Sequence, residues 1–116
     1  IHPGEVLELT LYWQAIGETD TEYTVFTHLV GPDGQIWGQK DNPPVQGTRP
    51  TSTWKRGEFL KDTYYILVNP NAPSGEYTLF VGMYNPIDGT RLIARSSTGE
   101  QWQHNAIPLT HIRLLP

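Results

Sequence analysis

The sequence predicts an all-β protein, an antiparallel β-sandwich of about seven strands. Apolar side chains recur at every second position through most of the 116 residues, and no segment keeps the 3.6-residue period of a helix. The 11 glycines and 10 prolines are spread along the chain as turn signals and do not gather in one tract. Strand-like segments joined mostly by short turns are typical of a sandwich of two antiparallel sheets.

The seven expected strands are segments of alternating or β-branched apolar residues. They cover residues 5–13, 22–30, 35–40, 58–68, 76–84, 91–95 and 106–115. The first strand directs one apolar face toward the core, which consists of Leu7, Leu9, Leu11 and Trp13. In the last strand Pro108 lacks a backbone N–H, so that part of the strand must lie at a sheet edge or in a bulge.

Two short segments predict hairpin turns. In GPDG, residues 31–34, Pro32 presets φ for a type I turn and Gly34 can take the positive φ of a glycine bulge. NPIDGT, residues 85–90, predicts a second hairpin turn.

Tyr77 opens a late strand in the segment SGEYTL. Immunoglobulin-like folds place a tyrosine at this position, where its hydroxyl bonds to upstream backbone and forms a tyrosine corner. The alternative is an ordinary strand tyrosine. Together with the strand count, Tyr77 favours an immunoglobulin-like sandwich, formed as a single domain over residues 1–116.

Residues 41–58, DNPPVQGTRPTSTWKRGE, are too long for a hairpin turn. Their three prolines prevent ladder pairing, so we expect a crossover from one sheet to the other. Trp54 would anchor this crossover by covering the end of the core, and would then be buried. The alternative is a ligand platform with Trp54 exposed. A loop of this length is also the first candidate for a contact surface.

Composition and charge argue against several partners. The chain has 8 basic and 12 acidic residues, a net charge of −4 and scattered Lys and Arg, which disfavours nucleic acid and anionic membrane surfaces. No apolar run approaches the roughly 20 residues that span a bilayer, so we expect no direct membrane insertion of this domain. Cysteine is absent, which excludes disulfides. The chain begins at Ile1, and we interpret it as a piece of a longer or processed protein.

The motifs that carry chemistry are missing. The four histidines lack zinc spacing, the aspartates form no D-x-D-x-D ladder, and no G-x-S-x-G occurs. We therefore expect no metal, no cofactor and no catalytic residue. A calcium ion bridging loops, and a pair of carboxylates across a cleft as in a small hydrolase, are the alternatives that the sequence leaves open.

Three tryptophans are candidate ligand-binding residues. Trp37, Trp54 and Trp102 lie in or beside polar segments, and exposed on one surface they would form a platform on which sugar rings stack. The alternative is that each closes an end of the sandwich, with its N–H on a polar partner.

A second candidate site is a polar patch beside the crossover. The bulged hairpin register places His28 opposite Gly38 and Phe26 opposite Lys40, and Asp41 follows directly. His28, Lys40 and Asp41 could then lie together. A slip of one residue would change every one of these contacts.

Several phrases of the sequence resemble a known domain type. In order they are LYWQA, YTVFTHLVGPDG, QKDNPP, PTSTWKRGE, APSGEYTLFVGMYNP and GTRLIA, and they span roughly residues 4–114. The set resembles a β-sandwich domain found as a soluble tail on bacterial multi-pass membrane proteins similar to glycosyltransferases of the dolichyl-phosphate-mannose:protein mannosyltransferase type. The resemblance implies an extracytoplasmic position, tethered through a membrane-spanning parent, and it implies no catalytic residue.

We therefore expect a non-catalytic, extracytoplasmic accessory or interaction domain that binds a protein or a glycan. The alternative is a carbohydrate-binding module attached to a glycosyltransferase-like membrane protein.

Overall fold

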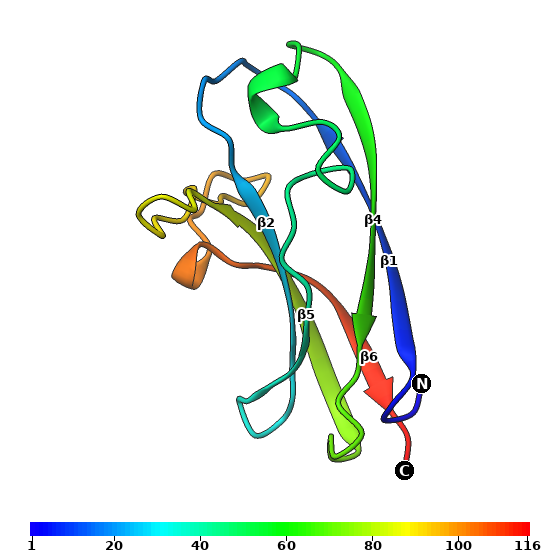
Figure 1. Cartoon of the computed structure of the whole chain (residues 1–116). Coiled ribbons are helices and arrows are strands. Elements are labelled where there is room, and N and C mark those ends of the chain that lie inside the picture. The colour runs from blue at the N-terminus through cyan, green and yellow to red at the C-terminus, as the bar shows by residue number, and fades with distance from the viewer.

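The structure, a computed structural model, describes all 116 residues (Figure 1). Its strands are β1 (Val6–Gln14), β2 (Thr24–Val30), β3 (Ile36–Gln39), β4 (Phe59–Leu67), β5 (Gly75–Tyr84) and β6 (Ile107–Leu114). Two short 3₁₀ turns, η1 (Thr51–Thr53) and η2 (Gln103–Asn105), are the only helical elements, and neither has the length or apolarity to cross a bilayer.

All strand pairs are antiparallel and form two sheets. The smaller sheet pairs β1 with β4, and the larger sheet has the order β3-β2-β5-β6. The predicted all-β fold with two antiparallel sheets is confirmed. The smaller sheet is thus two strands wide and packs on a larger sheet that is four strands wide.

The predicted strand over residues 91–95 is wrong, so the sheets hold six strands. The second hairpin turn forms as expected, because Asn85 N–H donates to Thr90 O at 2.8 Å and Gly89 takes a φ of 76°. Beyond the turn, Arg91 makes only an isolated bridge to Tyr84. The position beside β5 is already filled by β6 as far as Val81, so the returning segment leaves the sheet. Residues 85–106 therefore form a projecting segment, called the arm here (Figure 1).

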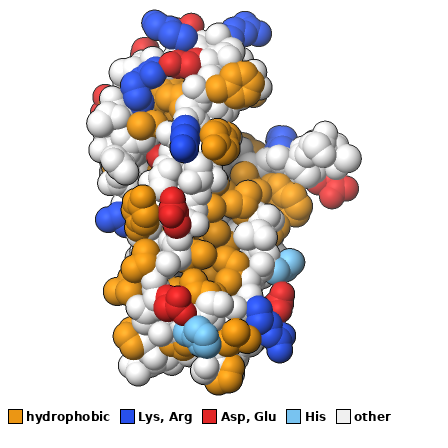
Figure 2. Space-filling view, turned by 90° about the vertical axis from the view of Figure 1, so that its right-hand side faces the viewer, with side chains coloured by type: hydrophobic (Ala, Val, Ile, Leu, Met, Phe, Trp, Pro, Cys, Tyr) orange, Lys and Arg blue, Asp and Glu red, His pale blue; other side chains and the backbone are white.

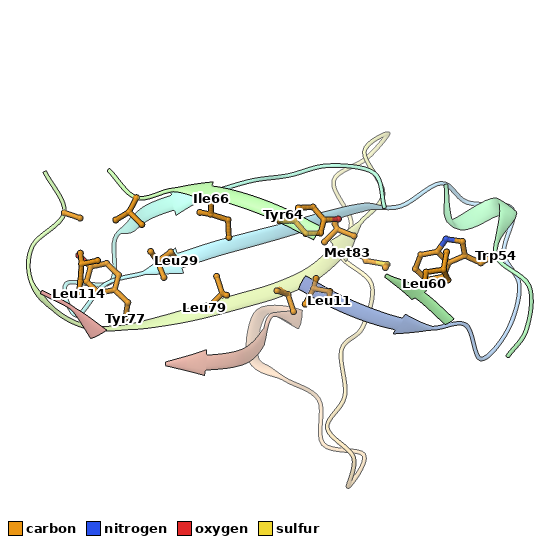
Figure 3. Close-up of a cluster of buried hydrophobic side chains, with 14 of the residues drawn as sticks. Leu11, Leu29, Trp54, Leu60, Tyr64, Ile66, Tyr77, Leu79, Met83 and Leu114 are labelled. Carbon is orange, nitrogen blue, oxygen red and sulfur yellow. The ribbon is translucent and has the colours of Figure 1, made fainter. Parts of the chain in front are cut away.

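The core lies between the two sheets (Figure 3). The inward face of β5 is buried as its alternation predicts, and it consists of Tyr77, Leu79, Val81 and Met83. On β1 the prediction holds only in part. Leu11 is buried, whereas Leu7, Leu9 and Trp13 are half-buried because β1 is an edge strand of the narrower sheet.

Three further local predictions are confirmed. Tyr77 is fully buried and its hydroxyl donates to Pro73 O at 2.6 Å, four residues upstream, which is the tyrosine-corner contact. In the first hairpin Gly34 N–H donates to Gly31 O at 3.0 Å and Gly34 has a φ of 78°. Pro108 lies on the edge strand β6 beside a bulge, as its missing N–H requires.

The predicted register of the first hairpin is wrong by one residue over most of its length. His28 pairs with Gln39 and Leu29 with Gly38, and the register shifts at the next pair. A Cβ on Gly38 would come within 3.0 Å of Ile66 Cγ2 on β4. Gly38 therefore permits close packing of the smaller sheet, and it does not make room for His28.

The crossover prediction for residues 41–58 is supported by how the segment packs. Trp54 is 8% exposed, and its Nε1–H donates to Arg49 O at 2.9 Å. Its ring centroid lies 6.2 Å from that of Trp13. The backbone N–H of Val45 donates to the buried carboxylate of Asp62 at 2.7 Å. At the start of the segment, Asn42 and Val25 of β2 exchange backbone hydrogen bonds at 3.0 Å, so the crossover is anchored to both sheets.

Candidate functional site

The sandwich is open along one side, because the two strands of the smaller sheet do not cover all four strands of the larger sheet. Half-buried apolar side chains face this opening from both sheets: Leu7 and Leu9 on β1, and Ile107 and Ile112 on β6. β1 and β6 are not paired with each other. Figure 2 shows apolar side chains on the floor of a recess, next to the arm that projects to the right.

The recess contains an apolar groove formed by two adjoining hollows of about 460 and 220 Å³. Trp13, Met83 and Leu92 line both hollows, so they are the shared wall of what we call the apolar groove. Ile16 extends the larger hollow and Ile107 the smaller. Leu92 remains 41% exposed. The groove therefore presents apolar surface to solvent at a place where core residues also reach it.

A buried carboxylate holds Trp13 in place at the edge of this groove. Trp13 Nε1–H donates to Asp62 Oδ2 at 3.0 Å, and the Tyr64 hydroxyl donates to the same oxygen at 2.6 Å. The Val45 N–H satisfies Oδ1. Burial, strengthened by the hydrogen bond to Asp62, raises the pKa of Tyr64. Three donors thus compensate a fully buried charge and connect β1, β4 and the crossover.

The opposite face of the larger sheet carries a polar pocket of about 310 Å³. Its walls come from β2, β5 and the arm, which includes η2, and they consist of His28, Val30, Phe80, Arg91, Gln103, His104 and Ala106. His28 Nε2 lies 3.9 Å from Asp41 Oδ1, and the Tyr84 hydroxyl donates to Asp41 Oδ2 at 3.1 Å. Burial lowers the pKa of His28, an effect that Asp41 opposes and Arg91 reinforces.

Arg91 fastens the arm over this face. Its guanidinium lies 4.2 Å from the centroid of the Phe26 ring, a cation–π contact, and it donates to His104 O at 2.9 Å. Phe26 in turn packs against Gly82, where a Cβ would overlap the ring. His104 and Asn105 both have positive φ, 57° and 51°, so the backbone at the pocket rim is strained.

The polar patch predicted from the sequence forms in part. The structure brings His28 and Asp41 together because Asp41, in the observed register, stands across from Phe26 on the face that His28 shares. Lys40 does not line the polar pocket, and its backbone N–H donates to Thr27 O at 3.1 Å.

The three candidate tryptophans do not share one surface. Trp37 O accepts from Asn69 N just beyond the end of β4, whereas Trp54 precedes the start of β4. The nine residues of β4 separate them by about 30 Å. Trp37 is half-buried, and its Nε1–H donates a hydrogen bond to Asp33 Oδ1 at 3.1 Å. Trp102 is half-buried on the arm.

Sequence reasoning missed two features of the surface. Met83 and Leu92 belong to segments that we expected to be plain strands, so the groove between them was not foreseen. Tyr12, Phe59 and Tyr65 are 71%, 71% and 56% exposed on the outer face of the smaller sheet. The alternation in β1 does place Tyr12 opposite the apolar face, which is the signal that could have identified it.

No group of three or more His, Asp or Glu side chains is placed to hold a metal ion. No family model, curated protein or solved structure matches the chain.

Proposed function

We propose that the chain is a non-catalytic interaction domain that binds a protein partner through the apolar groove. The observation that carries the proposal is the groove itself, because Trp13, Met83 and Leu92 form a continuous apolar wall that remains open to solvent. Contiguous exposed apolar surface in a folded domain is typical of a binding site. Elsewhere polar groups are well matched, and no buried side-chain nitrogen or oxygen lacks a hydrogen-bond partner.

An immunoglobulin-like topology is part of this proposal. The strand with the tyrosine corner, β5, lies between β2 and β6, as the corresponding strand of an immunoglobulin sheet lies between its two neighbours. The β1–β4 pair then corresponds to the centre of the opposite immunoglobulin sheet, which has further strands outside this pair. On this assignment the position beside β1 is a strand position that the chain leaves vacant.

The absence of catalysis is supported by the composition of the polar pocket. The best-placed ionisable pair at this pocket is His28, which lines it, and Asp41, which lies 3.9 Å from His28 but outside the lining. None of the seven lining residues is Ser, Thr or Cys, so this pair has no nucleophile beside it. The buried carboxylate of Asp62 is occupied by three donors and points into the core.

The resemblance in sequence supports a place for the domain: outside the cytoplasm, as a tail on a membrane-spanning glycosyltransferase-like protein. The two termini lie together at one end of the sandwich, where Leu115 N–H donates to Ile1 O at 2.8 Å (Figure 1). Trp13 and Leu92 lie toward the other end of β1. In a parent of this kind, attachment at either terminus would leave the groove accessible.

Selection of a random peptide library on the immobilised domain tests the proposal. We expect enriched peptides whose binding is lost in Leu92→Asp, which places a charge in the groove. Ile87→Asp is the matched control, because Ile87 is 92% exposed at the arm tip and does not line the groove. Peptides that bind both variants equally, or no enrichment at all, would contradict a protein-binding role for the groove.

A carbohydrate-binding module is the second candidate, and the polar pocket favours it over the tryptophan platform. Phe80 provides an apolar ring there, beside the planar polar groups of Arg91 and Gln103. Such a combination suits a pyranose, which has one apolar face and a rim of hydroxyls. Millimolar or tighter binding of a saccharide in calorimetric titration, lost in Phe80→Ala and kept in Leu92→Asp, would favour this function. A glycan array without any signal would refute it.

A further inference from the structure

β1 has an unused hydrogen-bonding edge. Val68 N–H donates to Glu5 O and Ala15 N–H donates to Glu58 O, each at 2.9 Å, so the odd-numbered residues of β1 bond to β4. Antiparallel ladders alternate in this respect. The even-numbered residues therefore direct their backbone N–H and C=O groups away from β4, and these are Val6, Glu8, Thr10, Tyr12 and Gln14.

This edge lacks most of the features that protect strand edges in folded proteins, and Glu8 is its one charged side chain. Natural edges are kept short or carry proline, lysine or a bulge. The edges of the larger sheet follow this rule, because β3 has only four residues and β6 contains Pro108 beside a bulge. β1 has nine residues with an unbroken register, and neither proline nor lysine. Such an edge is suited to pairing with another strand.

The apolar groove lies beside the end of this edge at Trp13, and the half-buried side chains of Leu9, Ile107 and Ile112 continue the apolar floor of the vacant position. A strand added to β1 would direct alternate side chains inward, toward Met83, Leu92 and Ile107. The outward side chains would stand next to the even-numbered residues of β1. Backbone partners and an apolar floor are therefore provided together, as in peptide recognition by β-strand addition.

The space fits one strand and not a second sandwich. A copy of this domain paired through its own β1 in the antiparallel sense, as all strand pairs of this chain are, would bring its four-stranded sheet to the same side of the extended sheet. Because Ile107 of β6 and Leu92 of the arm share a hollow with Trp13 beside the vacant position, the two larger sheets would overlap. The occupant that the geometry admits is an isolated extended segment.

Charge indicates the chemistry of that segment. The first 39 residues hold six acidic side chains and no Lys or Arg. Glu8 is the charged residue on the outer face of β1, and Glu18, Asp20 and Glu22 follow in the loop at its end. Only Glu18 among these four lies within ion-pair distance of a basic side chain, at 3.9 Å from Lys55 Nζ. A basic segment would complement this edge.

We propose that an extended peptide segment, with alternating apolar side chains and Lys or Arg at its outward positions, adds to β1 as a third strand of the smaller sheet. The proposal rests on the proposed function, because both use the apolar groove. It goes further in naming the backbone edge and the pattern of the partner.

The test uses a synthetic peptide, Lys-Val-Thr-Val-Thr-Leu-Thr-Val-Lys, with blocked ends, and two N-methylated isomers. Residues directly opposite on paired strands share a face, so the Thr amides of the bound peptide would face the outward-pointing amides of β1. N-methylation of two Thr residues should weaken binding at least tenfold, because it removes donors to β1. N-methylation of two Val residues should leave binding intact, because these amides face solvent.

Hydrogen exchange of the domain locates the contact. On saturation with the peptide, the amides of Glu8, Thr10 and Tyr12 should exchange at least tenfold more slowly, because free strand edges exchange fast. Protection of the odd-numbered residues of β4 instead, such as Thr63, would mean that the peptide pairs with the other edge of this sheet, and the proposal would be wrong.

A charge reversal adds a matched pair of variants. Glu8→Lys should weaken binding of the lysine-ended peptide severalfold and strengthen binding of the same peptide ended with Glu. Glu100→Lys makes the same change of charge on an exposed part of the arm and should have no effect.

The outcomes separate the two proposals. Equal binding of both N-methylated isomers, with loss in Leu92→Asp, would refute strand addition and keep the groove as a binding site. No binding of the unmethylated peptide at about 1 mM, a free energy near −4 kcal/mol, would also refute strand addition. The library selection then still decides whether the groove binds protein at all.

Discussion

Replacing Trp54 by alanine tests whether the long crossover is held by its anchor. The side chain is 8% exposed, so the substitution removes nearly all of a buried indole. It also leaves Arg49 O without the Nε1–H donor at 2.9 Å, and Trp13 without its aromatic neighbour at 6.2 Å. Emptying a large aromatic site of this kind costs about 3–5 kcal/mol. In a domain of this size, each kcal/mol lowers the melting temperature by about 5 °C.

Urea denaturation followed by circular dichroism measures the effect. We expect the transition of Trp54→Ala to shift to lower urea by the equivalent of about 3–5 kcal/mol. Trp54→Phe keeps most of the apolar volume but loses the hydrogen bond, so its loss should be smaller, about 1–3 kcal/mol. Trp102→Ala is the control, because Trp102 is only half-buried on the arm. A curve for Trp54→Ala that overlays that of the parent would refute the anchor.

Three further predictions concern acid, packing and metal. Arg49, whose Nη1–H and Nη2–H donate to Glu58 at 2.8 and 2.7 Å, lowers the pKa of Glu58 to about 2 from 4.5. The stability that this ion pair contributes is thus present above pH 4.5 and lost as the pH falls toward 2. In an acid titration of the free energy of unfolding, Glu58→Gln should lack this part of the loss. Gly82→Ala should lower stability by about 1–3 kcal/mol, measured in urea, because the new Cβ overlaps the Phe26 ring, whereas Gly17→Ala has free space and should be near neutral. EDTA should leave the melting temperature unchanged, and a drop of more than about 5 °C, about 1 kcal/mol, would instead indicate a structural calcium ion.

The strands were predictable where a local pattern determines them. Six of the seven expected segments are strands, because alternation and turn residues specify them within a few positions. The segment RLIAR, residues 91–95, has apolar residues like those of the six strands, yet it does not form a strand. Whether it pairs depends on β6, which comes later in the chain and takes the position beside β5.

Register and site depend on contacts between distant segments. The position of Gly38 is set by Ile66 on another sheet, and no feature of the hairpin itself reveals this. His28 and Asp41 could be predicted to lie close because both belong to the first hairpin, His28 on β2 and Asp41 just after β3. The apolar groove could not, since it arises from the unequal widths of the two sheets, and the exposure of Trp13 follows from the same cause.

The narrow sheet also has consequences for the order in which the molecule assembles and opens. Its two strands are joined across the whole first half of the chain, as in the contact between the hydroxyls of Thr10 and Thr63, which are 53 residues apart. A two-stranded pair is marginal by itself, so it depends on the larger sheet for support. We expect β1 to dock late in folding and to detach first in local unfolding. Any ligand that pairs with β1 would then raise the kinetic barrier to opening of the whole domain.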